Sequence, residues 1–495
     1  MSRPASARVV VRAPRVRRDT VTFSWTTEPG NPMQHEDRWS IRYDGLDLSR
    51  LDRVVLYDVL LSLQLPVWAA LADRVEVRVE EPVPGVVARW WRAYHDADGV
   101  EQSGAVTDAD RYDAVRRPLP GRPADVAVSF GGGKDSSLAL HALAEGRDPD
   151  RIVLVHLVHP FSRRPRVFRQ AARRSRRTVL APVQRTVPVR SQLVRTDFLG
   201  TLTARGRALR PHVNLYVAAT LPALLLHGVE AVTVSRNALG YRTTTGADGR
   251  TRWASASGRP ERLEALAAYY SRVLGVRLLP EGTHYAIGEL VSFGALLRLH
   301  PAGLETAVMC MRSASAGRWC LDCAKCFEHF LFQSALDRPD PRLDADRLLG
   351  RSAYVAGLVE AARAAGDTTA WHGNAPFDPR IGTPSHFGSF CHGLHRVEPA
   401  DLRDRLGADA ARALSTLREA WGRVRFESTE VIQAAALEAS GPLGTEVATD
   451  AARAFPVVHE WPGPLLVGDS RAELRHDRRM PVPALDRVLA ELGAR

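Results

Sequence analysis

Uninterrupted apolar runs alternate with helical patterns in the middle of the chain. The runs at 126–128 and 152–159 are short and carry no acidic or basic residue apart from histidine, which is typical of parallel strands covered on both faces. Another buried strand is expected between Gly228 and Ser235. Residues 212–227 have the pattern of a long helix that ends at Gly228. This alternation predicts an α/β fold with a doubly wound parallel sheet at 119–335, whose ligands would bind at the carboxyl ends of the strands.

The flanking regions have different patterns. Residues 1–118 contain alternating strand-like runs and one apolar helical stretch at 51–71, which predicts a separate α+β module. Residues 336–495 are rich in alanine and predict a mostly helical region. No apolar run is long enough to span a membrane and the first residues lack the apolar core of a signal peptide, so we expect a cytoplasmic protein without a membrane partner.

A glycine-rich turn separates the run at 126–128 from a helical pattern. The turn consists of Gly131, Gly132, Gly133, Lys134, Asp135 and Ser136. Glycines let backbone N–H groups approach an anion, and the following helix adds partial positive charge, so the expected ligand is a phosphate. The turn lacks the Ser or Thr that follows lysine in a Walker A loop, and the G-x-G-x-x-G pattern is also absent. An ordinary strand–helix turn is the alternative.

The predicted topology places further residues at the same edge of the sheet. The position after Leu157 and residues 235–237 end the neighbouring strands. His156 and His159 lie on an apolar strand and are expected to pack in the core or against an adenine. A long polar loop follows Ser235, and arginines there could neutralise a pyrophosphate; the nearest are Arg236, Arg242, Arg250 and Arg252.

A second candidate site is a cluster of four of the five cysteines in the chain: Cys310, Cys320, Cys323 and Cys326. Cysteines at two-residue spacing are typical of a tetrahedral structural zinc site. An iron–sulfur cluster is the alternative, since three cysteines at this spacing can also hold one. The fourth cysteine favours zinc because it closes the site.

The formal net charge of +11 invites an interaction with nucleic acid. Of the 67 basic residues, however, only Lys134 and Lys325 are lysines, a bias that indicates codon usage in a GC-rich genome. The arginine-rich stretch 161–177 is either a solvated helix face or a basic patch for RNA or polyphosphate. The two lysines occur in the two candidate sites, where a compact ammonium differs from a planar guanidinium.

The glycine turn resembles the PP-loop of ATP pyrophosphatases, S-G-G-x-D-S, with glycine in place of the first serine. Together with the segment AIGELVSFGALL and the C-x2-C-x2-C array, it resembles the deazaguanine nitrile synthase (QueC) family. The loop GGGKDS, the segment PHVNLYVAATLPALLLHGVEAVTVS, the cysteine spacing and a downstream GNAPFD are more similar to the MurL family. Members of that family are ATP-dependent epimerases of the terminal glutamate in UDP-N-acetylmuramoyl-L-Ala-L-Glu.

The resemblance implies a HUP-like fold, ATP, Mg²⁺ and adenylation of a small-molecule or peptidyl carboxylate with release of pyrophosphate. Asp135 would act through Mg²⁺, Lys134 and the glycine N–H groups would hold phosphate, and Arg236 would assist catalysis. A ligase or thiolating enzyme and an arginine-rich nucleic-acid-binding protein are the alternatives. The irregular C-terminal stretch contains further candidate acid–base residues: His372, Asp378, His386, Cys391 and His392.

Overall fold

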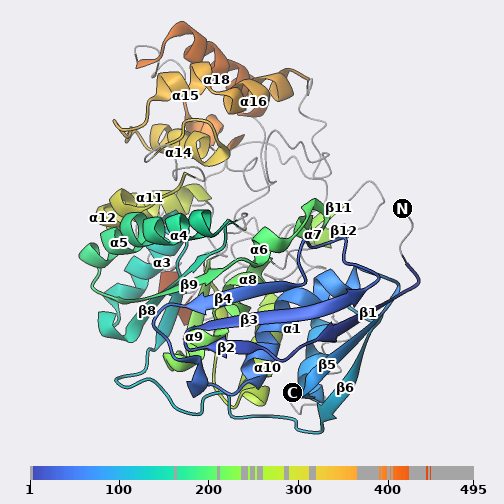
Figure 1. The fold of residues 1–495 in the computed structure, drawn as a ribbon. Helices are drawn as coiled ribbons and strands as arrows, with labels where there is room; N and C mark the ends of the chain where they lie inside the picture. Colours follow the sequence, from blue (N-terminus) through green and yellow to red (C-terminus); the bar gives the residue numbers. More distant parts are fainter. Residues whose placement is uncertain are drawn as a thin grey trace.

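The structure is a computed structural model that describes residues 4–160, 164–208, 212–235, 243–245, 251–253, 260–283, 289–310, 319–364, 390–391, 393–398, 402, 405–422, 442–443 and 446–447. One eleven-stranded mixed sheet organises most of these residues (Figure 1). Its strands are β1 (Ser6–Val11), β2 (Arg15–Arg17), β3 (Thr20–Glu28), β4 (Arg38–Tyr43), β5 (Arg74–Pro84), β6 (Val100–Thr107), β7 (Val126–Ser129), β8 (Ile152–Val158), β9 (Arg190–Thr196), β10 (Ala231–Ser235) and β13 (Leu279–Thr283).

Helices pack around this sheet and form a group of their own in the C-terminal region. The helices up to β13 are α1 (Val54–Ala69), α2 (Gly85–Tyr94), α3 (Lys134–Glu145), α4 (Pro165–Arg174), the π-helical turn η3 (Ser175–Leu180), α5 (Ala181–Thr186), α6 (Phe198–Thr201), α7 (Ala204–Ala208), α8 (His212–Ala218), α9 (Leu221–Leu226) and α10 (Pro260–Val273). The later helices are α11 (Glu289–Leu299), α12 (Pro301–Thr306), α14 (Ala324–Ala335), α15 (Ala345–Arg351), α16 (Ala353–Ala364) and α18 (Ala408–Trp421).

Five neighbouring strands form one parallel part of the sheet, in the order β13-β10-β7-β8-β9. The chain adds β8 and β9 on one side of β7, and then returns to add β10 and β13 on the other side. This reversal is the arrangement of a doubly wound sheet, and it creates a topological switch point between β7 and β10. The sequence prediction of an α/β fold with a parallel sheet is confirmed at this level.

Both faces of the central strands β7 and β8 are covered, which is why nearly all of their residues are apolar. Ala127 and Val153 pack in a cluster with residues of α1, α9 and α10. Their chain neighbours Val126 and Leu154 face the opposite cluster, which includes residues of α3, η3 and α5. Successive side chains of a strand point to opposite faces, so a strand between two helical layers needs apolar residues at every position.

The predicted N-terminal α+β elements are present, but their strands do not form a separate sheet. β4 pairs antiparallel with β9, with Arg42 opposite Arg195. β3 and β1 continue the sheet outward by antiparallel pairs, and β5 and β6 then extend it in parallel. The boundary predicted at residue 118 falls between β6 and β7 along the chain, but strands from both sides of it belong to the same sheet.

The helix predicted at 212–227 is divided into α8 and α9. Proline lacks an N–H group and clashes with the preceding turn, so Pro222 begins a new helix rather than continuing the first. At this break Thr220 Oγ1 donates to the carbonyl of Val217 over 3.1 Å. A second small sheet, β11 (Thr243–Thr245) paired with β12 (Thr251–Trp253), lies within the polar loop after β10.

The C-terminal helices α14, α15, α16 and α18 lie together at one end of the molecule (yellow to orange in Figure 1). They share an apolar cluster that includes Phe327, Leu348, Leu358, Leu414 and three of the four clustered cysteines. None of the helices that the structure describes is both long enough and apolar enough to cross a membrane.

Candidate functional site

The glycine turn lies where β7 ends, beside the switch point. Gly132 has a φ of +80°, in the left-handed region that favours glycine. A Cβ at this position would also stand 2.6 Å from Cγ1 of Val179 in η3. Both the backbone angle and the close approach of η3 therefore require glycine here.

The two flanking glycines face open space. A Cβ built on Gly131 or Gly133 would meet no heavy atom within 4 Å. Gly133 precedes the first residue of α3 and provides no side-chain cap for it. The first N–H groups of a helix lack partners within the helix and carry partial positive charge, so this open, uncapped start suits an anion.

Lys134 and Asp135 form an ion pair at the start of α3. The Lys134 ammonium donates to Oδ1 and Oδ2 of Asp135 over 2.8 and 2.9 Å. The Lys134 side chain is only 3% exposed, whereas that of Asp135 is 30% exposed. Burial of an ammonium is tolerated when a charge partner compensates for lost hydration. Ser136 Oγ donates to the carbonyl of Gly133 over 3.2 Å and so closes the turn.

Neighbouring strands hold the turn in place. The N–H of Phe130 donates to the carbonyl of Val155 over 2.9 Å, and the Ser129 N–H donates to Thr233 Oγ1 over 3.2 Å. These bonds tie the end of β7 to both β8 and β10. Ser235 ends β10, and its buried Oγ has no hydrogen-bond partner within the described part of the chain, leaving a polar atom available at the switch point.

The candidate residues on or next to β8 pack against other parts of the fold. Leu157 is buried in the cluster that contains α1 and α9. Nδ1 of His156 lies 2.6 Å from the carbonyl of Phe130, and burial lowers the pKa of this histidine, so a neutral ring supports the turn. His159 Nε2 lies 3.2 Å from the Tyr216 hydroxyl. These contacts agree with the expected packing role.

Several candidates lie outside the described residues or side chains. They are Arg236, Arg242, Arg250, Arg252, His372, Asp378, His386 and His392. Cys391 is described, and its side chain is fully buried in the apolar cluster of the C-terminal helices. The Cys391 thiol is therefore not exposed to solvent among the described residues.

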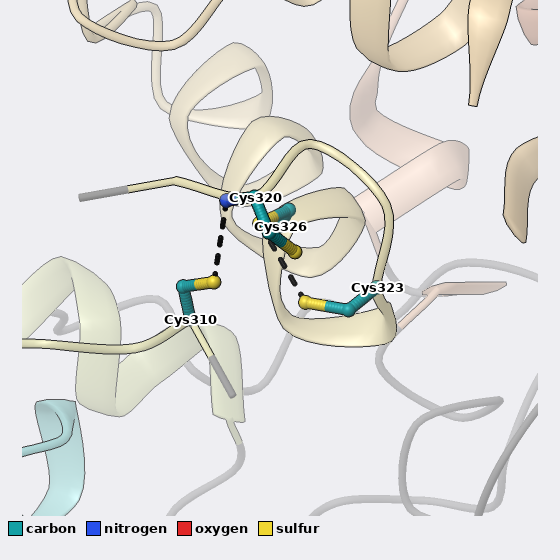
Figure 2. A group of neighbouring side chains, drawn as sticks. All are labelled: Cys310, Cys320, Cys323 and Cys326. Carbon is teal, nitrogen blue, oxygen red and sulfur yellow. Dashed lines mark hydrogen bonds between the residues drawn. The ribbon is translucent and has the colours of Figure 1, made fainter. Parts of the chain in front are cut away.

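The four remaining cysteines converge, as predicted (Figure 2). One sulfur from each of Cys310, Cys320, Cys323 and Cys326 lies within 4.8 Å of all the others. The Sγ atom of Cys326 is 3.8 Å from that of Cys320 and 3.6 Å from that of Cys323. Zinc–sulfur bonds of about 2.3 Å in a tetrahedron place sulfurs about 3.8 Å apart, so the cluster fits a four-thiolate metal ion.

Local backbone structure brings these sulfurs together. Cys323 is the N-cap of α14, and the N–H of Cys326 donates to its carbonyl over 3.0 Å. Leu321 has a φ of +58°, which turns the chain sharply between Cys320 and Cys323. The Cys320 N–H points to the Cys310 sulfur over 3.3 Å. A knuckle of this kind presents thiolates and N–H groups to one point.

The thiols influence one another's ionisation. Burial raises the pKa of Cys320 to about 11. Hydrogen bonds with Cys310 and Cys326 lower the pKa of Cys323, whereas those with Cys310 and Cys323 raise that of Cys326. A bound divalent cation would favour thiolates throughout the cluster.

Sequence reasoning missed two supports of these sites. Asp322, inside the cysteine array, accepts hydrogen bonds from Ser352 Oγ over 2.9 Å and from the Tyr354 N–H over 2.8 Å. It thereby fastens the knuckle to α16. The Val308 N–H donates to the Gly132 carbonyl over 2.7 Å, two residues before Cys310. The position of Asp322 within the cysteine array is visible in the sequence, whereas a hydrogen bond between backbone atoms leaves no signal there.

Comparison of the chain with protein-family models, curated proteins and solved structures found no match. The motifs and the geometry of the two sites therefore carry the functional argument.

Proposed function

We propose that this protein is an ATP pyrophosphatase of the PP-loop type, which transfers AMP to a substrate carboxylate and releases pyrophosphate. The observation that carries the proposal is the open, uncapped start of α3 at the switch point, where Gly131 and Gly133 leave room for an anion. The paired Lys134 and Asp135 at the same place support it. An ordinary strand–helix turn has no need for a nearly buried lysine in a chain that contains only two.

The side chains of the loop suggest separate roles. The N–H groups at the start of α3 and the Lys134 ammonium would bind phosphate oxygens. Asp135 would hold Mg²⁺, because this ion takes one or two carboxylates together with substrate phosphates, and the exposed Asp135 oxygens are of that donor type. When bound, the metal neutralises charge on the triphosphate. Binding would require Asp135 to exchange part of its contact with Lys134 for the cation.

The four-cysteine cluster is assigned a structural role. Its sulfurs fit zinc, and three of the four cysteines are buried. A closed set of four protein ligands leaves no position for a substrate. The hydrogen bond from Val308 to Gly132 connects this folded knuckle to the phosphate loop. Metal binding would therefore stabilise the loop as well as the C-terminal helices.

The reaction that best accounts for the resemblance is MurL-like epimerisation. The substrate carboxylate attacks the α-phosphorus of ATP, and pyrophosphate leaves. The acyl adenylate has a more acidic α-proton than a carboxylate anion, since its carbonyl delocalises the carbanion. A base removes this proton, a proton returns on the opposite face, and water releases AMP and the epimerised acid. The terminal L-Glu of UDP-N-acetylmuramoyl-L-Ala-L-Glu or a related peptide is the proposed substrate.

The test uses purified protein, ATP, Mg²⁺ and a set of candidate acids in deuterated water. We expect AMP, pyrophosphate and product labelled at its α-carbon. Pyrophosphate release without α-deuterium, together with an amide or thioacid when ammonia or sulfide is supplied, would replace epimerisation by ligation or thiolation. Formation of ADP and phosphate would overturn the ATP pyrophosphatase assignment itself.

A further inference from the structure

Five arginines line a pocket of about 480 Å³ where α4 and η3 meet strands β4 and β9. They are contributed by β4, β9, α4 and η3, and comprise Arg42, Arg169, Arg173, Arg176 and Arg195. The other lining residues are Asp44, Gly45 and Ala172. One lining carboxylate therefore faces five guanidinium groups, although Arg42 also pairs with Asp19 outside the lining, with 2.9 Å between Nε and Oδ2. A pocket of this volume is large enough for a small-molecule ligand.

Three of these arginines are held in place by Asp44. Its carboxylate lies 3.0 Å from Nε of Arg195 and 3.3 Å from Nε of Arg42, and it also pairs with Arg176. The Asp44 side chain is only 11% exposed. Arg42 and Arg195 are directly opposite each other in adjacent strands, where like charges repel. Asp44 offsets that repulsion and fixes the positions of the guanidinium groups.

Arg169 and Arg173 add charge that no carboxylate of the described residues pairs with. They lie one turn apart on α4, both side chains are exposed, and neither has an ion-pair partner among the residues described here. No aspartate or glutamate occurs at 151–196, a stretch that covers the whole helical segment and both flanking strands. Like charges four residues apart destabilise a helix. The helix thus keeps an unfavourable pair where it lines the pocket.

The pocket and the phosphate loop share a structural element. η3 provides Arg176 to the pocket, and its Val179 contacts Gly132 of the loop. η3 is a π-helical turn, a local irregularity that occurs frequently at functional sites. The pocket is separate from the start of α3, because none of residues 131–136 lines it.

We propose that this arginine pocket binds the phosphate or diphosphate group of a small phosphorylated ligand. Guanidinium groups bind phosphate oxygens through paired hydrogen bonds, and several of them converging on one cavity match a compact diphosphate. The identification of this ligand as the substrate that becomes adenylated rests on the proposed function. Binding of an anion in the pocket does not. A substrate held here by its phosphates would carry its carboxylate on a separate part of the molecule.

The test is isothermal titration of the full-length protein with inorganic pyrophosphate, with and without saturating α,β-methylene-ATP. The analogue is added to occupy the phosphate loop. We expect binding that persists with the analogue and weakens roughly tenfold or more in the double variant Arg169→Gln/Arg173→Gln. Arg185→Gln is the matched control, because Arg185 is an exposed arginine at the end of α5 that does not line the pocket; its affinity should equal that of the wild type.

The melting temperature of the double variant shows whether it remains folded. Removing the repulsion between Arg169 and Arg173 should leave the melting temperature unchanged or slightly higher, so lost binding cannot be attributed to unfolding. Pyrophosphate affinity unaffected by the double substitution would overturn the proposal. It would also be overturned by salt-dependent RNA binding that is lost in the double variant without any pyrophosphate binding in the wild type, which would assign the arginines to nucleic acid. ATP cleavage assayed separately distinguishes failure here from failure of the proposed function.

Discussion

The backbone N–H of Val308 donates a 2.7 Å hydrogen bond to the carbonyl of Gly132. Gly132 is the residue of the glycine turn that adopts a positive φ, and Val308 lies two residues before Cys310, the first cysteine of the four-cysteine cluster. The two sites, which are almost 180 residues apart along the chain by their numbering, are therefore joined by one direct contact. A change in either site should be measurable at the other.

The first prediction concerns metal and folding. Purified protein should contain one zinc per chain, and Cys323→Ser or Cys326→Ser should lower both zinc content and the melting temperature, because metal-binding energy contributes to folding. Chelation should also reduce pyrophosphate release if the Val308 contact transmits the change. Metal analysis by mass spectrometry and a thermal melt measure these effects.

Cys391→Ser is the matched control for the metal prediction. It removes a buried thiol in the same apolar cluster but outside the group of four, so stability should fall while zinc stoichiometry stays at one. Iron with visible absorbance would show an iron–sulfur cluster instead, and absence of any metal would refute the site.

The second prediction separates two neighbouring glycines. Gly132→Ala should destabilise the protein by about 1–3 kcal/mol, because it forces a side chain into positive φ and against Val179. Gly131→Ala should change the free energy of unfolding by less than about 0.5 kcal/mol, since its Cβ enters open space without positive φ. Urea unfolding measures both values. Equal stabilities for the two variants would contradict the described geometry of the turn.

The third prediction tests the ion pair at α3. Asp135→Asn should abolish pyrophosphate release, because it removes the proposed Mg²⁺ ligand. It should also lower the melting temperature without unfolding the protein, since the nearly buried Lys134 loses its charge partner but can still donate to the asparagine side-chain oxygen. Lys134→Arg should impair turnover, since a planar guanidinium does not fit a site where the ammonium is almost fully buried. Circular dichroism controls for folding, and wild-type rates for either variant would refute the assigned roles.

The fourth prediction concerns Asp58, which is fully buried on α1 and accepts hydrogen bonds from Trp91 Nε1 over 2.7 Å and from the hydroxyls of Tyr112 and Tyr269. Burial raises the pKa of Asp58 to about 6 despite these hydrogen bonds, which lower it. A raised carboxyl pKa means that the folded state retains the proton longer than the unfolded state. The contribution of Asp58 to stability is therefore greatest below pH 4, decreases as pH rises to about 6, and is constant above.

The corresponding measurement is the unfolding free energy of wild type and Asp58→Asn between pH 4 and 7. The difference between the two proteins should change by up to about 3 kcal/mol over this window, in the direction of wild-type loss at higher pH. A pH-independent difference would show that Asp58 keeps an ordinary pKa in the folded protein.

Local patterns predicted the elements around the phosphate loop because each signal lies within a few residues. The apolar run at 152–159 became β8, and four cysteines at short spacing formed one cluster. The break between α8 and α9 was also visible in Pro222, although the apolar pattern continues through it. Short-range chemistry and hydrophobic burial were sufficient for these features.

Long-range pairing could not be predicted in the same way. The alternation in β4 indicates a strand but not its partner, so its pairing with β9 and the resulting continuous sheet appear only in three dimensions. The arginine pocket depends on that pairing, since Arg42 and Arg195 belong to the two strands. Asp58 likewise appears as the single charged residue in an apolar helix until folding places Trp91, Tyr112 and Tyr269 around it.

The most direct test of the proposed ATP pyrophosphatase activity is to determine which phosphoanhydride bond of ATP is cleaved. Phosphorus NMR should follow ATP, Mg²⁺ and the candidate acids, including UDP-N-acetylmuramoyl-L-Ala-L-Glu, with wild-type protein and with Asp135→Asn. We expect AMP and pyrophosphate with the wild type and neither product with the variant. Formation of ADP and phosphate, or equal amounts of AMP and pyrophosphate from the variant, would contradict this expectation.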